Sequence, residues 1–122
     1  MLISFLSRIF RFNKKKGVLS KFVPLGYEEF KKMSKQNDVV VLDVRTKTEF
    51  KQGHIPGAYN LDVFSRRFIR SLRSFPRSRT FLIYCRSGNR SLEACKILLA
   101  NGYKKVFYLQ GGILNWKGEI EK

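Results

Sequence analysis

A chain of 122 residues has room for one compact domain with a single core. The apolar share of 43% argues against global disorder, and no apolar run approaches the roughly 18 residues of a membrane-spanning helix. The 25 Lys and Arg against 9 Asp and Glu give a formal net charge of +16, which attracts anions such as nucleic acid, anionic lipid or small anionic substrates. Two cysteines, Cys85 and Cys95, are too few for a disulfide framework and indicate a reducing compartment.

The first 21 residues differ in composition from the rest of the chain. Apolar residues at the start recur at helical spacing, and no acidic residue accompanies the basic ones: Arg8, Arg11, Lys14, Lys15, Lys16 and Lys21. We predict a basic amphipathic extension over 1–21 and a separate domain over 22–122. Three roles are open for residues 1–16: contact with an anionic membrane surface, a cleaved targeting peptide, or a helix docked on a protein surface. The predicted location is cytoplasmic, free or peripheral at the inner membrane surface, with organellar targeting as the alternative.

From residue 21 onward, strand patterns alternate with helical ones. Apolar and β-branched runs predict strands at 21–24, 39–44, 58–61, 80–84 and 106–109. Helical spacing predicts helices at 27–35, 48–52, 64–75, 91–101 and 113–117. This alternation is typical of an α/β domain with a mostly parallel sheet. The side chains predicted to face the core are Phe64, Phe68 and Leu72 in one helix and Leu92, Cys95 and Leu99 in another.

The sharpest chemical feature is the segment from Cys85 to Ser91, which reads Cys-Arg-Ser-Gly-Asn-Arg-Ser. It joins a buried strand to a helix, and ligands of open α/β sheets bind at the carboxyl ends of the strands. Unpaired N–H groups at the start of the helix, together with the charges of Arg86 and Arg90, predict a cradle for an anion. Gly88 permits the backbone angles that curl such a loop. We therefore expect Cys85 to act as a thiolate nucleophile near neutral pH.

Four motifs stand in order along the chain: Asp43-Val44-Arg45 with Glu49-Phe50, Gly53-His54-Ile55-Pro56-Gly57-Ala58, the Cys85 loop, and Gly111-Gly112 with Trp116. In this combination and order they resemble the rhodanese superfamily, over about Val23 to Trp116. The resemblance implies a five-stranded, mostly parallel sheet with helices on both faces, so that residues 22–122 form a rhodanese domain.

The resemblance also implies a sulfurtransferase in which Cys85 takes sulfane sulfur from thiosulfate, or a related small anionic donor, and holds it as a persulfide. An acceptor then takes the sulfur, and cyanide, a thiol or a protein cysteine would serve. No metal or organic cofactor is expected, because the loop amides and the helix terminus hold the charge. The residues expected to bind the substrate are the rest of the loop: Arg86, Ser87, Gly88, Asn89, Arg90 and Ser91.

Three further residues are predicted to support the site without touching the sulfur. Asp43 and Arg45 end a strand that neighbours the Cys85 strand in the family, and we hypothesise that they brace the Cys85 loop by hydrogen bonds. His54, the single histidine, is interpreted as a structural residue in a turn. Trp116 is interpreted as core packing and Gly111-Gly112 as a tight turn.

Two other functions are consistent with a reactive cysteine in this fold. Cysteine-dependent phosphatases use a Cys-x5-Arg loop, whereas four residues separate Cys85 from Arg90, and this shorter loop favours sulfur transfer. A persulfide-carrying binding module for a partner protein would differ in its acceptor and not in its chemistry.

The stretch 65–79 is rich in arginine and contains no acidic residue. It is interpreted as a solvated surface that attracts anions in general. Nucleic-acid binding is not expected, because the chain lacks the aromatic and basic motif of a known RNA-binding module.

Overall fold

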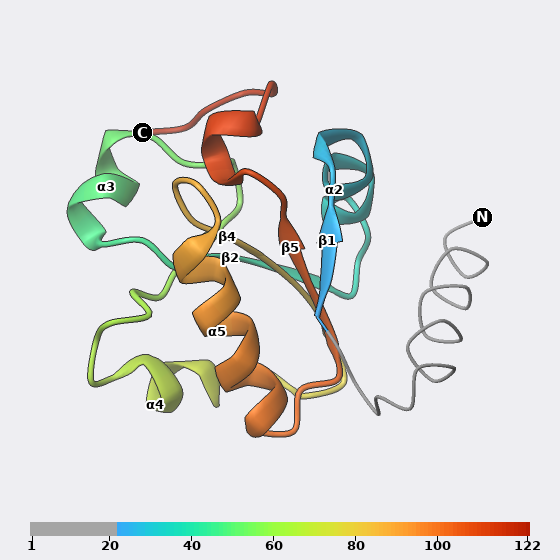
Figure 1. Cartoon of the computed structure of the whole chain (residues 1–122), viewed down its shortest axis with the longest axis vertical. Helices are drawn as coiled ribbons and strands as arrows, with labels where there is room; N and C mark the ends of the chain where they lie inside the picture. The colour runs from blue at the N-terminus through green and yellow to red at the C-terminus, as the bar shows by residue number, and fades with distance from the viewer. Residues whose placement is uncertain (1–21) are drawn as a thin grey trace.

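The computed structural model describes residues 22–122, so the extension predicted over 1–21 lies outside the described residues. The elements are β1 (Val23–Leu25), α2 (Tyr27–Ser34), β2 (Val39–Asp43), α3 (Lys47–Gln52), β3 (Tyr59–Asn60), α4 (Phe68–Leu72), β4 (Thr80–Tyr84), α5 (Asn89–Ala100), β5 (Lys105–Leu109) and the 3-10 helix η1 (Gly112–Asn115). The five strands form one sheet in the order β1-β5-β4-β2-β3 (Figure 1). Every neighbouring pair is parallel, which confirms the predicted α/β class.

Helices cover both faces of this sheet, because alternate side chains of its central strands point to opposite faces. In β4, Phe81 and Ile83 belong to the core that α4 and α5 cover, whereas Leu82 and Tyr84 belong to the core that α2 covers. Figure 1 shows α4 and α5 together and α2 apart from them. Burial on both faces explains why the sequence of β4 is almost continuously apolar.

The predicted helix over 64–75 is wrong in its extent, since α4 covers only Phe68–Leu72. Asp62 begins a series of turns instead: its carboxylate accepts from the backbone N–H of Phe64 at 2.9 Å, and its carbonyl accepts from that of Ser65 at 3.0 Å. Phe68 and Leu72 are buried as expected, but Phe64 is 71% exposed. Local side-chain bonding by aspartate thus competes with the helix that the apolar spacing suggests.

The helix that follows Cys85 also differs from its prediction. α5 begins at Asn89, and its buried residues are Ser91, Ala94, Cys95 and Leu98. Cys95 is in the core as predicted, whereas Leu92 and Leu99 are only half-buried. The buried face of α5 therefore begins at Ser91, whose backbone N–H donates to the Cys85 sulfur.

The remaining predicted elements agree with the structure to within two residues at each end. None of the helices within residues 22–122 is long and apolar enough to cross a bilayer.

Candidate active site

Cys85 directly follows β4 and is buried, at 1% exposure. Its Sγ accepts hydrogen bonds from the backbone N–H of Gly88 at 3.0 Å and of Ser91 at 3.4 Å. Gly88 is the N-cap of α5 and has φ of 122°, a backbone conformation that favours glycine. The sulfur therefore lies at the positive end of a twelve-residue helix, where peptide dipoles stabilise negative charge.

η1 holds the Cys85 loop from the other side. The backbone N–H of Ile113 donates to the carbonyl of Cys85 at 2.8 Å, and that of Leu114 donates to the carbonyl of Arg86 at 3.3 Å. Gly112 begins η1 with φ of 66°, and a β-carbon there would overlap the Arg86 carbonyl. Gly112 is thus required by the close approach of two backbones as well as by the turn that the sequence predicted.

Arg90 lies in the loop, but its guanidinium is turned toward α3. It makes a two-pronged ion pair with Glu49, at 2.6 Å to Oε1 and 2.9 Å to Oε2. The hydrogen bonds from Arg90 lower the pKa of Glu49 to about 2, and Glu49 in turn raises the pKa of Arg90. The predicted role of Arg90 in binding substrate stays a prediction, and in this structure its charge is already paired.

Glu49 is a site residue that the sequence reasoning did not assign. The signal for it is the Thr46-x-x-Glu49 spacing of a capping box. The Thr46 hydroxyl accepts from the backbone N–H of Glu49 at 3.2 Å, and Glu49 Oε1 accepts from that of Thr46 at 3.2 Å. The start of α3 therefore fixes the carboxylate that receives Arg90.

The buried pair of Asp43 and Arg45 contacts the turn at Gly53 and not the Cys85 loop, where the sequence predicts it. Arg45 Nη2 donates to Asp43 Oδ2 at 2.6 Å and to the carbonyl of Gly53 at 2.7 Å. Within the described residues, no hydrogen bond joins either side chain to the 85–91 loop. The hypothesis of direct bracing is therefore wrong, because the guanidinium reaches the turn at Gly53 instead.

Tyr84 links that turn to the strand that carries the cysteine. Its hydroxyl accepts from the backbone N–H of Ile55 at 3.0 Å, and its ring lies 5.6 Å from the guanidinium carbon of Arg45. Burial, together with the nearby Asp43 carboxylate, raises the pKa of Tyr84, so that the hydroxyl stays neutral. Asp43 and Arg45 thus lie against the residue that precedes Cys85, and their supporting role stays a prediction.

His54 has the contacts of a structural residue. Its Nδ1 lies 2.8 Å from the carbonyl of Phe50, and its Nε2 lies 3.3 Å from the Glu121 carboxylate. The ring stacks on that of Phe50 with 3.6 Å between centroids. Both ring nitrogens have partners away from Cys85, which supports the structural interpretation.

The other residues of the loop differ in exposure. Arg86, Ser87 and Asn89 are exposed, whereas Ser91 is fully buried. Among residues 22–122, Ser91 Oγ is the one buried side-chain polar atom without a hydrogen-bond partner. It belongs to the residue whose N–H already contacts the Cys85 sulfur.

Cys95 is one helical turn beyond Ser91 and is fully buried. Burial raises the pKa of its thiol, and the nearby Cys85 adds to the shift. Cys95 is therefore a neutral core residue, as the sequence predicted.

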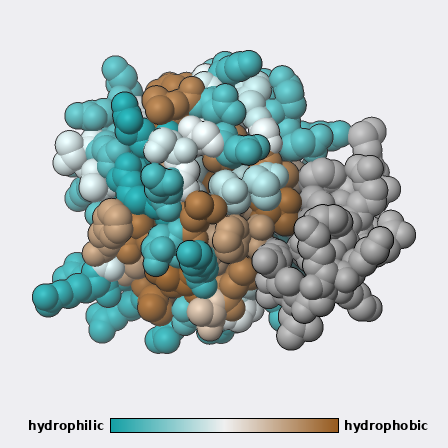
Figure 2. Space-filling view, in the orientation of Figure 1, coloured by the Kyte–Doolittle hydropathy of each residue, from teal (hydrophilic) through white to brown (hydrophobic). Residues whose placement is uncertain are grey.

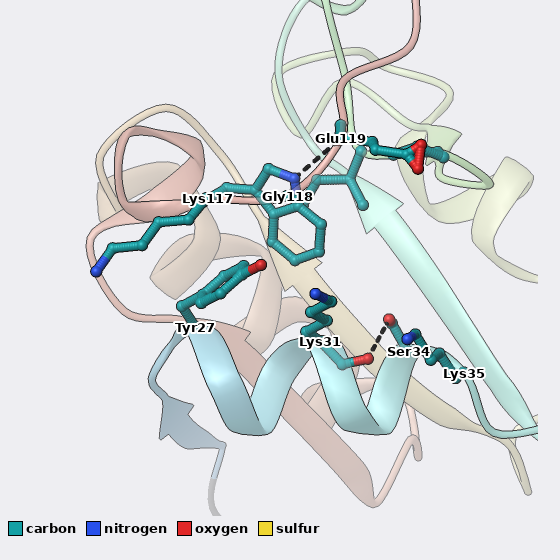
Figure 3. Close-up of a pocket in the computed structure, with 10 residues that line it drawn as sticks. Tyr27, Lys31, Ser34, Lys35, Lys117, Gly118 and Glu119 are labelled. Atoms are coloured by element: carbon teal, nitrogen blue, oxygen red, sulfur yellow. Dashed lines mark hydrogen bonds between the residues drawn. The ribbon is translucent and has the colours of Figure 1, made fainter.

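A cavity of about 600 Å³ lies on the face of the sheet that α2 covers, between α2 and the segment after η1. Lys31 rises from α2 toward the segment of Gly118 and Glu119, and Tyr27 lies beside it (Figure 3). No residue of the 85–91 loop lines this cavity, so it is separate from the cysteine site.

A parallel α/β domain with a buried cysteine cradled by the first amides of a helix is of the class that rhodaneses share with some cysteine phosphatases. The sequence profile of the rhodanese-like domain matches residues 26–119. The chain belongs to this family.

Relatives and solved structures agree with this assignment. A protein of Allochromatium vinosum named sulfurtransferase is 40% identical over 85 residues, which are 70% of this chain and 78% of that protein. A tRNA uridine(34) hydroxylase of Bacillus cereus is 33% identical over 98 residues, which are 77% of this chain but 31% of that protein. The crystal structure of a rhodanese-like domain protein from Staphylococcus aureus superposes with a TM-score of 0.70 at 29% identity, covering 82% of this chain and 97% of that one.

Proposed function

We propose that the protein is a sulfurtransferase in which Cys85 takes up sulfane sulfur as a persulfide and passes it to a thiophilic acceptor. The observation that carries this proposal is the pair of backbone N–H groups, from Gly88 and Ser91, that converge on the Cys85 sulfur at the start of α5. Such a cradle stabilises a sulfur anion without a metal ion. The sulfurtransferase of Allochromatium vinosum, at 40% identity, supports the same reaction class.

The reaction balances with thiosulfate as the donor. The Cys85 thiolate attacks the outer sulfur of thiosulfate, a new sulfur–sulfur bond forms, and sulfite leaves with the electron pair of the bond that breaks. An acceptor thiolate or cyanide then attacks the outer sulfur of the persulfide, and the Cys85 thiolate is restored. In both steps the nucleophile and the leaving group are anions, so no separate general base is required.

Ser91 adds a side-chain donor to this cradle. Its backbone N–H donates to Cys85 Sγ at 3.4 Å, and its hydroxyl is buried without a hydrogen-bond partner. An unpartnered buried hydroxyl costs about 1–3 kcal/mol. In the proposed reaction, Ser91 Oγ donates its proton in a hydrogen bond to the anionic sulfur of Cys85, which offsets this cost and stabilises the thiolate as a leaving group.

A phosphatase reaction fits this geometry less well. Phosphate transfer requires an arginine free to bind the equatorial phosphate oxygens, and both prongs of Arg90 are held by Glu49. The loop also has four residues between Cys85 and Arg90, which leaves less room for a tetrahedral dianion.

The test is to incubate the purified full chain with thiosulfate and measure intact mass, then to add cyanide or a thiol and follow sulfite and thiocyanate. The expected result is a gain of one sulfur atom at Cys85, discharged by the acceptor and absent in Cys85→Ser. Phosphate release from an aryl phosphate that depends on Cys85, without any sulfur gain, would instead establish the phosphatase.

A further inference from the structure

The sequence between Asp62 and Glu93 contains arginine as its only charged residue type. The eight arginines are Arg66, Arg67, Arg70, Arg73, Arg77, Arg79, Arg86 and Arg90. All of them except Arg90 are exposed. Arginine, more than lysine, pairs in two-pronged fashion with carboxylates. This composition is therefore better suited to binding an acidic protein surface than to simple exposure to solvent.

The first part of this stretch begins beside the reactive cysteine. The backbone N–H of Leu61 donates to the carbonyl of Asp43 at 2.9 Å, and that of Val63 donates to the carbonyl of Val44 at 3.2 Å. Asp43 is in register with Tyr84, the residue before Cys85. Residues 61–63 are therefore fixed at the carboxyl edge of the sheet, next to the strand end that carries the sulfur.

From that edge the chain turns outward and exposes an apolar side chain beside the arginines. Phe64, which directly follows residues 61–63, is 71% exposed. On the other side of the Cys85 loop, Leu114 is 65% exposed and its N–H is bonded to the carbonyl of Arg86. Figure 2 shows apolar surface over η1 and again over the region of α4 and α5, with hydrophilic side chains between them.

We propose that these side chains form a docking rim for an acidic protein that presents the cysteine to which the sulfur is passed. The rim consists of Phe64, Arg66 and Arg67, which follow residues 61–63 at that edge, and of Arg86 and Leu114 at the Cys85 loop. This inference rests on the proposed function and names the acceptor class for the same site. The acceptor thiolate attacks the outer sulfur of the Cys85 persulfide, the bond between the two sulfurs breaks, and the Cys85 thiolate is released.

The occupant is a protein because the cysteine beside the rim is buried. Cys85 is 1% exposed, so an acceptor must bring its thiolate into the loop. An anionic lipid surface offers negative charge but no thiol. An acidic polypeptide offers carboxylates for the arginines, apolar side chains for Phe64 and Leu114, and a cysteine for the sulfur.

The test uses three synthetic peptides that contain one cysteine and one leucine and differ only in whether the flanking residues are Glu, Gln or Lys. Cys85 is loaded with thiosulfate, and the second-order rate of persulfide discharge by each peptide is measured at low and high salt. The Glu peptide is expected to react at least about tenfold faster than the Gln peptide at low salt, with the advantage reduced at high salt. Equal rates for the three peptides would overturn the proposal.

Two variants with the same change in charge separate the rim from the overall charge of the protein. Arg66→Glu combined with Arg67→Glu should reverse the order of the Glu and Lys peptides and leave discharge by 2-mercaptoethanol unchanged. Lys31→Glu combined with Lys35→Glu, on α2, should leave the order intact. An equal effect of both double variants would show that net charge alone is responsible and would overturn the proposal.

Binding to Cys85→Ser distinguishes failure of the rim from failure of the sulfurtransferase. The same peptides with Ser in place of Cys should bind in the order Glu, Gln, Lys, whether or not the wild type takes up sulfur. Absence of any persulfide together with this order would reject the proposed function and keep the rim. A rim that binds poly(A) or vesicles of anionic lipid, but shows no preference among the peptides, would belong to nucleic acid or membrane and not to a protein acceptor.

Discussion

Glu49 and Arg90 are 41 positions apart in the sequence, yet their side chains meet in a two-pronged ion pair. Glu49 is fixed by the capping box at the start of α3, and Arg90 lies in the first turn of α5. The pair therefore ties the helix that cradles the Cys85 sulfur to a neighbouring element at the same edge of the sheet.

The pH dependence of stability should report on this ion pair. The folded-state pKa of Glu49 is about 2, below its ordinary value of 4.5. Its contribution is therefore complete above about pH 4.5 and is lost as the pH falls toward 2. Glu49→Gln should lower the free energy of unfolding by about 1 kcal/mol at neutral pH, since the pair is partly exposed. Urea unfolding of the wild type and of Glu49→Gln at pH 7 and pH 3 checks this, with Glu93→Gln, at an exposed position, as control. A difference in unfolding free energy between wild type and Glu49→Gln that is as large at pH 3 as at pH 7 would contradict it.

Gly112 should be the least replaceable glycine at the site. Gly112→Ala forces a β-carbon into the Arg86 carbonyl, and because the obstacle is backbone it cannot rotate away. We expect a loss of about 3 kcal/mol in stability and of sulfur uptake at Cys85. Gly57→Ala is the matched control, because Gly57 also has positive φ but no atom within 4 Å of its built β-carbon. Both variants place alanine at a positive φ, but only Gly112→Ala creates the overlap. Equal losses of stability in thermal unfolding would therefore rule out the overlap as the cause.

Replacing Ser91 should lower activity without lowering stability. Ser91→Ala removes a buried hydroxyl that has no partner, so the free energy of unfolding should be unchanged or slightly higher. Persulfide formation and discharge should slow by about tenfold, which corresponds to about 1.4 kcal/mol of lost stabilisation. The rate at which iodoacetamide alkylates Cys85 is the second readout, because the proposed contact of the hydroxyl with the sulfur should affect its reactivity. Ser34→Ala, far from the loop, serves as control, and wild-type rates in Ser91→Ala would remove the hydroxyl from the mechanism.

The two cysteines should differ in reactivity. Burial raises the pKa of the Cys95 thiol, so it remains protonated at neutral and mildly alkaline pH. Iodoacetamide should therefore modify one cysteine in the native protein, and peptide mapping should place it at Cys85. Cys85→Ser should then take up no label until it is unfolded in urea. Labelling of native Cys95 at a comparable rate would show that the α5 face opens readily.

The order of strands and helices could be read from the sequence because it depends on local periodicity. β4 was predicted with both ends correct, since burial on both faces leaves an uninterrupted apolar run. The extent of α4 could not be read in this way. The spacing of Phe64, Phe68 and Leu72 suggests a helix, but the carboxylate of Asp62 holds the first of these in a turn.

The sequence by itself determined which residues form the Cys85 loop and that a helix starts within it. A cysteine at a strand end, followed by glycine, arginines and a helix start, predicts an anion cradle, because the N–H groups of a first helical turn depend on local structure alone. Only the tertiary structure decided which side chains hold that cradle in place. Glu49 takes the charge of Arg90, Gly112 admits the Arg86 carbonyl, and Arg45 reaches Gly53 instead of the loop. These are contacts between segments far apart in the sequence, and they are set by the parallel register that brings the strand ends to one edge of the sheet.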